Sequence, residues 1–204
     1  LFHIPYPIDQ KIFRPKKILS IPKIGLLKNK KIKIFFGVFG NSKDKRKGID
    51  LLIKSLNRVD PNLFELIVAS KNSFTDNSKF EIKNIGYIEN ENQLSDIYNL
   101  CDLVAITSRL DNLPNIAIEA QSCGKPIVSY DVGGLSDIVK NNYNGYIIDP
   151  YNYKFFSKKL EKLIKNKNLR KRFSINAYRF SKKHWSHRVI KNKYVKNLSN
   201  IILN

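Results

Sequence analysis

Residues 103–128 restrict the fold more than any other part of this chain, because two apolar runs flank a polar loop and a helical pattern. Leu103 to Ile106 predicts a buried strand, and Ile127 to Ser129 predicts another. Between them the pattern from Pro114 to Ser122 predicts a helix, with proline near its first position. Two strands joined in this way run parallel, so the segment predicts one strand–helix–strand unit of a parallel sheet.

The same alternation continues along the chain. Further apolar runs predict strands at Ile32–Phe39, Phe64–Ala69 and Tyr146–Ile148, and Ile82–Ile88 contains a short predicted strand that reaches Gly86-Tyr87. Helical patterns open at Gly48 and at Leu94–Leu100, Leu135–Lys140, Phe155–Asn166, Leu169–Ser181 and His187–Leu203. The alternation predicts an α/β fold, a Rossmann-like parallel sheet with helices on both faces. Ligands bind at the carboxyl ends of such strands, so we expect a site beside the loops after Phe39, Ile106 and Ser129.

The chain divides into three predicted parts. Residues 1–22 hold four prolines and few helical signals, which is typical of an extended interdomain linker. Residues 23–165 form the predicted Rossmann-like domain, and residues 166–204 form C-terminal helices. The chain begins with Leu1 and contains no methionine, so we expect a piece of a longer protein whose N-terminal portion is absent.

The chain carries 37 lysines and arginines against 17 acidic residues, a formal net charge of +20. Nucleic-acid binding, attraction to an anionic membrane and the compositional bias of AT-rich genomes all fit this excess. The basic residues are spread along the chain and lack the interleaved aromatic residues of a base-stacking surface. We therefore expect no nucleic-acid partner and favour the compositional bias, with peripheral membrane contact as a consequence.

Cysteine and histidine positions favour neither a disulfide scaffold nor a metal site. Cys101 and Cys123 fall within apolar patterns, which predicts buried thiols in a reducing cytoplasm. His3, His184 and His187 lack metal-ligand spacing, so no metal or other cofactor is expected. No apolar run approaches the ~20 residues that span a bilayer. These features predict a cytoplasmic location, at the inner face of the membrane if the charge contacts lipid.

Two carboxylates, Asp111 and Glu119, lie on either side of the predicted helix start at Pro114. Carboxylates accept hydrogen bonds from sugar hydroxyls, and the free N–H groups of a helix start attract phosphate. Each residue also has a structural alternative: Asp111 as the N-cap of the helix, and Glu119 as a solvated helix-face residue. The apolar neighbours of Glu119, from Ile116 to Ala120, make an unpaired carboxylate costly there, which favours a bound ligand.

Six short segments occur in the order and spacing of a known enzyme family. They are Pro7-Ile8-Asp9 with Phe13-Arg14-Pro15, Arg46-Lys47-Gly48-Ile49-Asp50, Asp111 to Glu119, Cys123 to Val128, Asp131-Val132-Gly133-Gly134 and Gly145-Tyr146-Ile147-Ile148. Together they resemble the C-terminal, donor-binding domain of family 4 retaining glycosyltransferases with the GT-B fold, of the "glycosyl transferases group 1" type. The resemblance covers nearly the whole chain.

The resemblance implies sugar transfer from a nucleoside-diphosphate donor to a hydroxyl acceptor with retention, by a hexosyltransferase-type enzyme of bacterial lipopolysaccharide or capsule biosynthesis. In this family the acceptor, a glycan or lipid-linked glycan, binds mainly to the N-terminal domain. We therefore expect this chain alone to bind the donor but to transfer poorly. The alternative is a non-catalytic or truncated nucleotide-sugar-binding domain. A GT-B epimerase or phosphorylase is disfavoured, because those enzymes lack this order of motifs.

For the residues that match its motifs, the resemblance implies particular roles. Glu119 accepts bonds from the ribose hydroxyls, and Lys47 holds the diphosphate. Asp111, one methylene shorter than the family's usual Glu, lies near the transferred sugar and the diphosphate. The family places an arginine where this chain has Lys43, so Arg46 or Lys43 takes that role. The structural alternative for Lys47 is a solvated lysine in a basic loop.

Backbone groups complete the implied site. Gly40 lets the backbone approach the diphosphate, with a plain turn as an equal interpretation. The N–H groups of Asn112 and Leu113 donate to sugar hydroxyls, and Pro114 opens the helix whose start attracts phosphate. Tyr87 lies where the family places backbone contacts to the base, while its side chain is expected to pack.

Overall fold

The computed structural model describes residues 6–17, 30–38, 44–72, 74 and 78–202. Its strands are β1 Ile32–Val38, β2 Phe64–Ser70, β3 Ile82–Asn84, β4 Leu103–Ile106, β5 Ile127–Tyr130 and β6 Gly145–Ile148. A short 3-10 helix, η2, lies at Lys45–Lys47. The α-helices are α1 Ile49–Leu56, α2 Glu91–Leu100, α3 Asn115–Ser122, α4 Leu135–Ile138, α5 Tyr153–Lys165, α6 Lys167–His184 and α7 His187–Ile202. The predicted alternation of strands and helices is confirmed.

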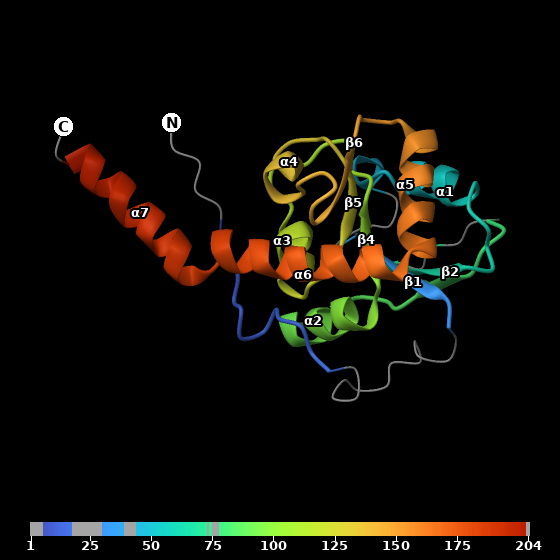
Figure 1. Cartoon of the computed structure of the whole chain (residues 1–204), viewed down its shortest axis with the longest axis horizontal. Helices are drawn as coiled ribbons and strands as arrows, with labels where there is room; N and C mark the ends of the chain where they lie inside the picture. Colours follow the sequence, from blue (N-terminus) through green and yellow to red (C-terminus); the bar gives the residue numbers. More distant parts are fainter. Residues whose placement is uncertain (1–5, 18–29, 39–43, 73, 75–77, 203–204) are drawn as a thin grey trace.

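The six strands form one parallel sheet in the order β3-β2-β1-β4-β5-β6 (Figure 1). The chain moves outward from β1 to β3, returns to the middle at β4, and then moves outward on the other side. β1 and β4 are therefore neighbours, with Ile34 opposite Leu103. The loops after these two strands diverge, which opens a crevice at the carboxyl edge of the sheet where folds of this type bind ligands.

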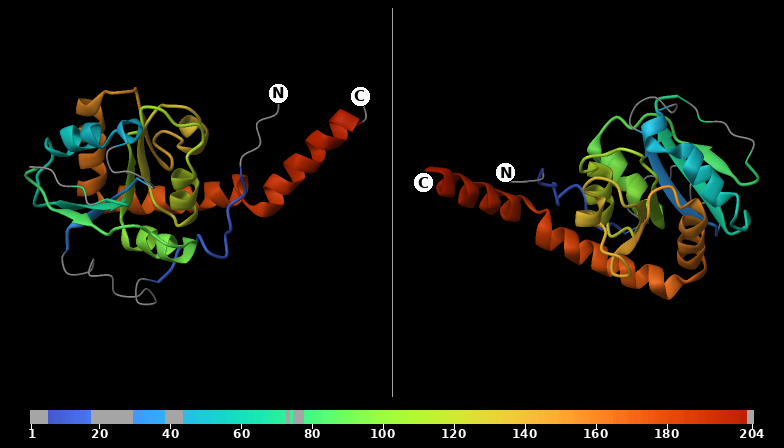
Figure 2. Two further views of the ribbon diagram at one scale, coloured as in Figure 1. Left: turned by 180° about the vertical axis from the view of Figure 1, so that it is seen from behind. Right: turned by 90° about the horizontal axis from the view of Figure 1, so that it is seen from above.

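Helices cover both faces of the sheet, which confirms the predicted Rossmann-like fold class (Figures 1 and 2). Side chains along β1 alternate, so that Phe35 enters one core and Phe36 enters the other. The first core contains residues of α2, α3 and α4, and the second contains residues of α1 and α5. α6 contributes to both, with Phe173 in the second core and Phe180 against the first.

Residues 6–17 pack against the domain. Phe13 is buried in the first core, and the backbone N–H of Ile8 donates to the carbonyl of Trp185 at 2.9 Å. The hydroxyl of Ser95 on α2 donates to the carbonyl of Ile12 at 2.7 Å. This segment therefore forms part of the folded unit, and its role as an interdomain linker stays a prediction, as do the predicted domain bounds.

Three helices begin earlier than predicted. The sequence placed their starts at the first apolar residues, Leu94, Phe155 and Leu169, whereas α2, α5 and α6 begin two or three residues before these. At each start an asparagine side chain accepts a hydrogen bond from the third backbone N–H of the helix: Asn90, Asn152 and Asn166. A polar N-cap necessarily precedes the first apolar residue, so apolar periodicity alone places such a start too late.

Other predicted bounds differ by a few residues. The strand predicted to reach Gly86-Tyr87 ends at Asn84 in the structure, and Gly86 has a φ of 74°, outside the extended conformation. α4 ends at Ile138 rather than at Lys140, since Val139 is already extended. The predicted ends at Phe39 and Leu203 lie outside the described residues.

Basic residues occur along the whole chain, as expected, but the net positive charge is concentrated toward its C-terminal end. Residues 151–204 contain 16 of the 37 basic residues but one of the 17 acidic residues, Glu161, and therefore carry +15 of the net +20. This segment forms α5, α6 and α7. Figures 1 and 2 show α6 running along the domain and α7 continuing beyond it. The C-terminal helices are thus a basic layer on one part of the molecule.

Candidate functional site

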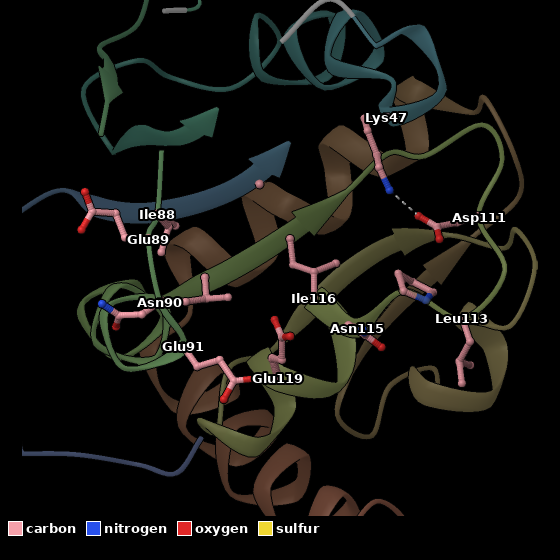
Figure 3. A pocket seen from close by; sticks show the side chains of 13 residues that line it. Lys47, Ile88, Glu89, Asn90, Glu91, Asp111, Leu113, Asn115, Ile116 and Glu119 are labelled. Carbon is pink, nitrogen blue, oxygen red and sulfur yellow. Dashed lines mark hydrogen bonds and ion pairs between the residues drawn. The ribbon is translucent and has the colours of Figure 1, made fainter. Parts of the chain in front are cut away.

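A cavity of about 540 Å³ lies at the predicted carboxyl edge of the sheet (Figure 3). Its walls come from the end of β1, the loops before α1, α2 and α3, and the first turns of α2 and α3. The lining residues are Gly37, Lys47, Ile88, Glu89, Asn90, Glu91, Leu94, Asp111, Leu113, Pro114, Asn115, Ile116 and Glu119. A smaller hollow of about 370 Å³ shares Lys47 and Asp111 with it. The crevice that the sheet order creates is therefore a real cavity.

Lys47 and Asp111 form an ion pair in the wall of this cavity, with 2.8 Å between Nζ and Oδ2 (Figure 3). Asp111 also accepts hydrogen bonds from the Ser108 hydroxyl at 3.3 Å and from the backbone N–H of Asn112 at 3.1 Å. It does not cap α3, whose N-cap is Pro114 without a side-chain capping bond. The N-cap alternative for Asp111 is therefore wrong, and its carboxylate instead orients Lys47.

A close backbone contact fastens the loop of Lys47 to the loop of Asp111. Gly48 has a φ of 67°, and a Cβ there would lie 2.0 Å from the carbonyl oxygen of Thr107. The Thr107 hydroxyl donates to the Gly48 carbonyl at 2.8 Å, and the backbone N–H of Arg109 donates to the Arg46 carbonyl at 2.6 Å. These contacts bridge the loops after β1 and β4, so the two charged residues hold fixed positions.

Arg109 reinforces this bridge from the solvent side. Its guanidinium donates to both carboxylate oxygens of Asp50 on α1, at 2.8 and 2.7 Å, and to the Lys45 carbonyl at 2.8 Å. Hydrogen bonding from Arg109 lowers the pKa of Asp50 below its ordinary value. The sequence patterns did not single out this pair for the bridge, because its two residues belong to segments that only the fold brings together.

The glycine turn before α4 supports the other side of the Asp111 loop. The backbone N–H of Gly134 donates to the Asn112 carbonyl at 2.5 Å. A Cβ at Gly133 would lie 1.8 Å from the carbonyl oxygen of Asp111. Glycine at both positions lets the turn pack directly on the backbone that carries Asp111 and Leu113.

Glu119 lies one turn inside α3, and its carboxylate points into the cavity (Figure 3). Its Oε2 accepts a hydrogen bond from the Tyr98 hydroxyl at 2.8 Å. Burial raises the pKa of the Glu119 carboxyl to about 7, and the charge of Glu91 acts in the same direction. The alternative of a fully solvated Glu119 is wrong, because the group is partly desolvated and faces a cavity.

The start of α3 forms the floor between these groups. No side chain caps this helix, and Pro114, Asn115 and Ile116 all line the cavity. Gly37 at the end of β1 permits the close approach, since a Cβ there would lie 2.8 Å from the Ile116 Cδ1 atom. Uncapped backbone N–H groups at a helix start form a favourable site for an anion.

The remaining predicted residues lie at different distances from the cavity. Arg46 and Asn112 line the smaller hollow, and the Arg46 guanidinium is held by both oxygens of Asp44 at 3.1 and 2.9 Å. Tyr87 is 60% exposed and lines neither cavity, so the expectation that its side chain packs is wrong. It follows the edge strand β3, where few elements can cover it. Lys43 and Gly40 lie outside the described residues.

Sequence reasoning missed the wall formed by the start of α2. Ile88, Glu89, Asn90 and Glu91 line the cavity, and Tyr98 lies behind it. The Asn90 cap, with a glutamine as the third helical residue, was a readable signal for a helix start at this point. No comparable local signal marks Tyr98, since its contact with α3 depends on the packing of two helices.

The cysteines behave as predicted. Cys101 and Cys123 are buried free thiols, and burial raises their pKa values to about 12 and about 11, so both stay protonated at neutral pH. Within the described ranges, no group of three or more His, Cys, Asp or Glu side chains is arranged to hold a metal ion.

Comparisons with known proteins identify similar chains. The family model described as "Glycosyl transferases group 1" matches residues 18–180. An uncharacterized glycosyltransferase of Methanocaldococcus jannaschii is 32% identical over 154 residues, which are 72% of this chain and 43% of that protein. The chain thus spans less than half the length of this relative.

Solved structures confirm the fold. Anabaena HepE in complex with UDP-glucose matches with a TM-score of 0.79 at 20% identity, covering 97% of this chain and 57% of that one. The C-terminal domain of the group 1 protein LpcC from Francisella tularensis matches with a TM-score of 0.71 at 21% identity, covering 88% of this chain and 99% of that one. The predicted likeness to the C-terminal half of the GT-B fold is confirmed.

We predict that Gly48→Ala destabilises the protein far more than Gly86→Ala. Both glycines have positive φ, so both variants pay about 1 kcal/mol for the left-handed conformation. Only the Gly48 variant also drives a Cβ into the Thr107 carbonyl, whereas nothing lies within 4 Å of a Cβ at Gly86. Urea denaturation should show that Gly48→Ala lowers the free energy of unfolding by at least about 2 kcal/mol more than Gly86→Ala does. Equal losses would contradict the bridging role of this contact.

We also predict that Glu119→Gln stabilises the protein at alkaline pH. The folded-state pKa of about 7 exceeds the ordinary 4.5, so wild-type stability falls as pH rises through this window. The Gln variant escapes this loss, which amounts to at most about 3 kcal/mol above pH 7. Thermal unfolding at about pH 4.5 and pH 8 measures the difference, with Glu81→Gln, an exposed glutamate outside the cavity, as the control. If the difference in stability between the wild type and Glu119→Gln is the same at both pH values, the burial argument is refuted.

Proposed function

The chain belongs to the group 1 glycosyltransferase family, and from this premise we propose that its cavity binds a nucleoside-diphosphate sugar as donor for transfer to a hydroxyl acceptor. One observation carries the proposal. A cation, an uncapped helix start and a partly buried carboxylate converge on a single cavity, through Lys47, Pro114 to Ile116, and Glu119. The volume of about 540 Å³ lies within the range of small-molecule sites.

Each part of a nucleotide sugar has a chemical counterpart in this cavity. The diphosphate fits Lys47 and the start of α3, because an ammonium group and the free N–H groups of a helix start both attract an anion. The ribose hydroxyls fit Glu119, which accepts two bonds when ionised. The base fits the wall near Ile88, and the sugar fits beside Asp111 with the Asn112 and Leu113 backbone. The UDP-glucose complex of HepE, a protein of the same fold, supports this class of ligand.

The Lys47–Asp111 pair gives the donor site a way to respond to its ligand. An arriving diphosphate competes with Asp111 for the Lys47 ammonium, because both are anions. Lys47 then stabilises the charge that grows on the departing nucleotide as the glycosidic bond breaks. Asp111 still accepts hydrogen bonds from the Ser108 hydroxyl and the Asn112 N–H, and its carboxylate can then accept another from a hydroxyl of the transferred sugar.

Retention at the anomeric carbon, hexosyl specificity and a role in bacterial surface polysaccharide synthesis belong to this proposal. They rest on the family 4 resemblance of the motif from Asp111 to Glu119. We propose no metal, since Lys47 and the start of α3 can supply the positive potential that a divalent cation supplies elsewhere. We also propose that the acceptor contacts residues outside this chain, which leaves donor binding without efficient transfer. A non-catalytic nucleotide-sugar-binding domain is the alternative.

A calorimetric titration with UDP, GDP and ADP without metal tests the donor site. We expect saturable binding of one nucleotide, with affinity at least about ten-fold weaker in Lys47→Met, because one charge-assisted bond to phosphate is lost. Lys54→Met, an exposed lysine of α1, is the matched control and should bind like the wild type. Failure of all three nucleotides to bind would rule out the donor site, and an equal loss in both variants would rule out the role of Lys47.

We further propose that α7, the last of the basic C-terminal helices, contacts an anionic membrane surface at the cytoplasmic face. No helix in the described part of the chain is long and apolar enough to cross a bilayer. α7 instead presents exposed lysines beside exposed apolar side chains, Tyr194, Val195 and Leu198. A helix of this composition suits the interface between headgroups and acyl chains.

Vesicle flotation tests this contact. We expect binding to phosphatidylglycerol vesicles but not to phosphatidylcholine vesicles, and loss of binding in high salt. Reversing Lys191, Lys193 and Lys196 to Glu should weaken binding more than ten-fold, since each lysine near the surface contributes about 1 kcal/mol. The same reversal at Lys154, Lys158 and Lys162 of α5 changes the net charge equally and serves as the control. Equal effects of both triple variants would show that α7 has no special role.

A further inference from the structure

Tyr98 lies directly behind the cavity, inside the core of the protein. Its side chain is fully buried on α2, and its ring packs edge-on against Phe35 of β1 at 5.2 Å between centroids. Phe13 of the N-terminal segment lies on another side, at 6.3 Å. These contacts fix the direction of the ring, and its hydroxyl reaches Oε2 of Glu119 at 2.8 Å.

A buried tyrosine hydroxyl needs a partner, but here the partner is a residue of the ligand cavity. Tyr98 is the one side chain that donates a hydrogen bond to Glu119 among the described residues. The bond occupies Oε2 and leaves Oε1 free for a ligand. Because an uncompensated carboxylate is costly at a partly desolvated position, this donor decides both where the carboxylate points and how readily it ionises.

The charged and titratable groups around Glu119 do not replace this donor. Glu91 at the start of α2 repels the charge of Glu119, and Cys123 at the end of α3 is a neutral thiol. Asp9 and His187 line a separate hollow of about 250 Å³ that Glu119 also lines. Across the main cavity the cation Lys47 is engaged with Asp111. Within the described residues no cation forms an ion pair with Glu119, so Tyr98 alone stabilises its ionised form there.

We propose that Tyr98 is a positioning residue that aims the Glu119 carboxylate at paired hydroxyls of the ligand. The inference rests on the proposed donor site and extends it to a residue that touches no ligand itself. The two oxygens of the Glu119 carboxylate then have different partners. Oε2 accepts the hydrogen bond from Tyr98, and Oε1 accepts hydrogen bonds from the ligand.

A pH signature separates this role from simple packing. The Tyr98 hydrogen bond lowers the pKa of Glu119, against burial, which raises it to about 7. Removing the hydroxyl must therefore raise the pKa of Glu119 further. A ligand that requires the ionised carboxylate then binds weakly at neutral pH and regains affinity in alkali.

The test compares Tyr98→Phe with the wild type by calorimetric titration of UDP, GDP and ADP between about pH 6 and pH 9. We expect affinity to fall at least ten-fold at neutral pH and to recover toward the wild-type value at the alkaline end. Tyr130→Phe is the matched control, since it removes another buried tyrosine hydroxyl, from β5 in the opposite core. That variant should keep the wild-type pH profile, because its ring lies on the other face of the sheet.

A second measurement does not depend on the nucleotide. The carboxyl ¹³C shift of Glu119, followed through pH by NMR, should show a higher midpoint in Tyr98→Phe than in the wild type. An unchanged midpoint, or an affinity loss that is equal at all pH values, overturns the proposal. If the wild type binds no nucleotide while the midpoint still rises, the donor site fails but the hydrogen bond to Glu119 is established. If the wild type binds and Tyr98→Phe binds equally at every pH, the positioning role alone fails.

Discussion

The contact between Gly48 and the Thr107 carbonyl is the constraint on which the rest of the site depends. A parallel sheet that reverses its winding between β1 and β4 separates the loops that follow these strands. The left-handed glycine lets the two backbones touch, and the hydroxyl of Thr107 completes the connection. Lys47 and Asp111 can form their ion pair only because this contact brings their loops together. The crevice typical of the fold thereby acquires a charged wall.

Much of the fold and part of the site follow from local patterns in the sequence. Apolar runs located the strands, and the spacing of Asp111 and Glu119 around Pro114 placed both carboxylates on one cavity. Tyr98 and the start of α2 could not be found in this way, because their roles arise from contacts between helices. The uneven charge was readable in the sequence, but its significance depended on seeing residues 151–204 as one helical layer.

Glu119 shows how the ligand site opposes the stability of the fold. Burial raises the pKa of this carboxyl to about 7, so its ionised form is less favoured in the empty cavity than it would be in water. Among the described residues, the hydrogen bond from Tyr98 alone compensates this unfavourable group. Residues at functional sites commonly carry such a cost, because a ligand supplies the missing partners. The bound state is then relieved of a penalty that the free state retains.

The packing of Phe13 against Tyr98 links the N-terminal segment to the cavity in thermodynamic terms. Residues 6–17 help to hold the ring whose hydroxyl contacts Glu119, so docking of the segment and occupancy of the cavity share one set of contacts. Two equilibria coupled in this way must favour each other by the same factor. A ligand that orders Glu119 would therefore stabilise the docked position of this segment at equilibrium.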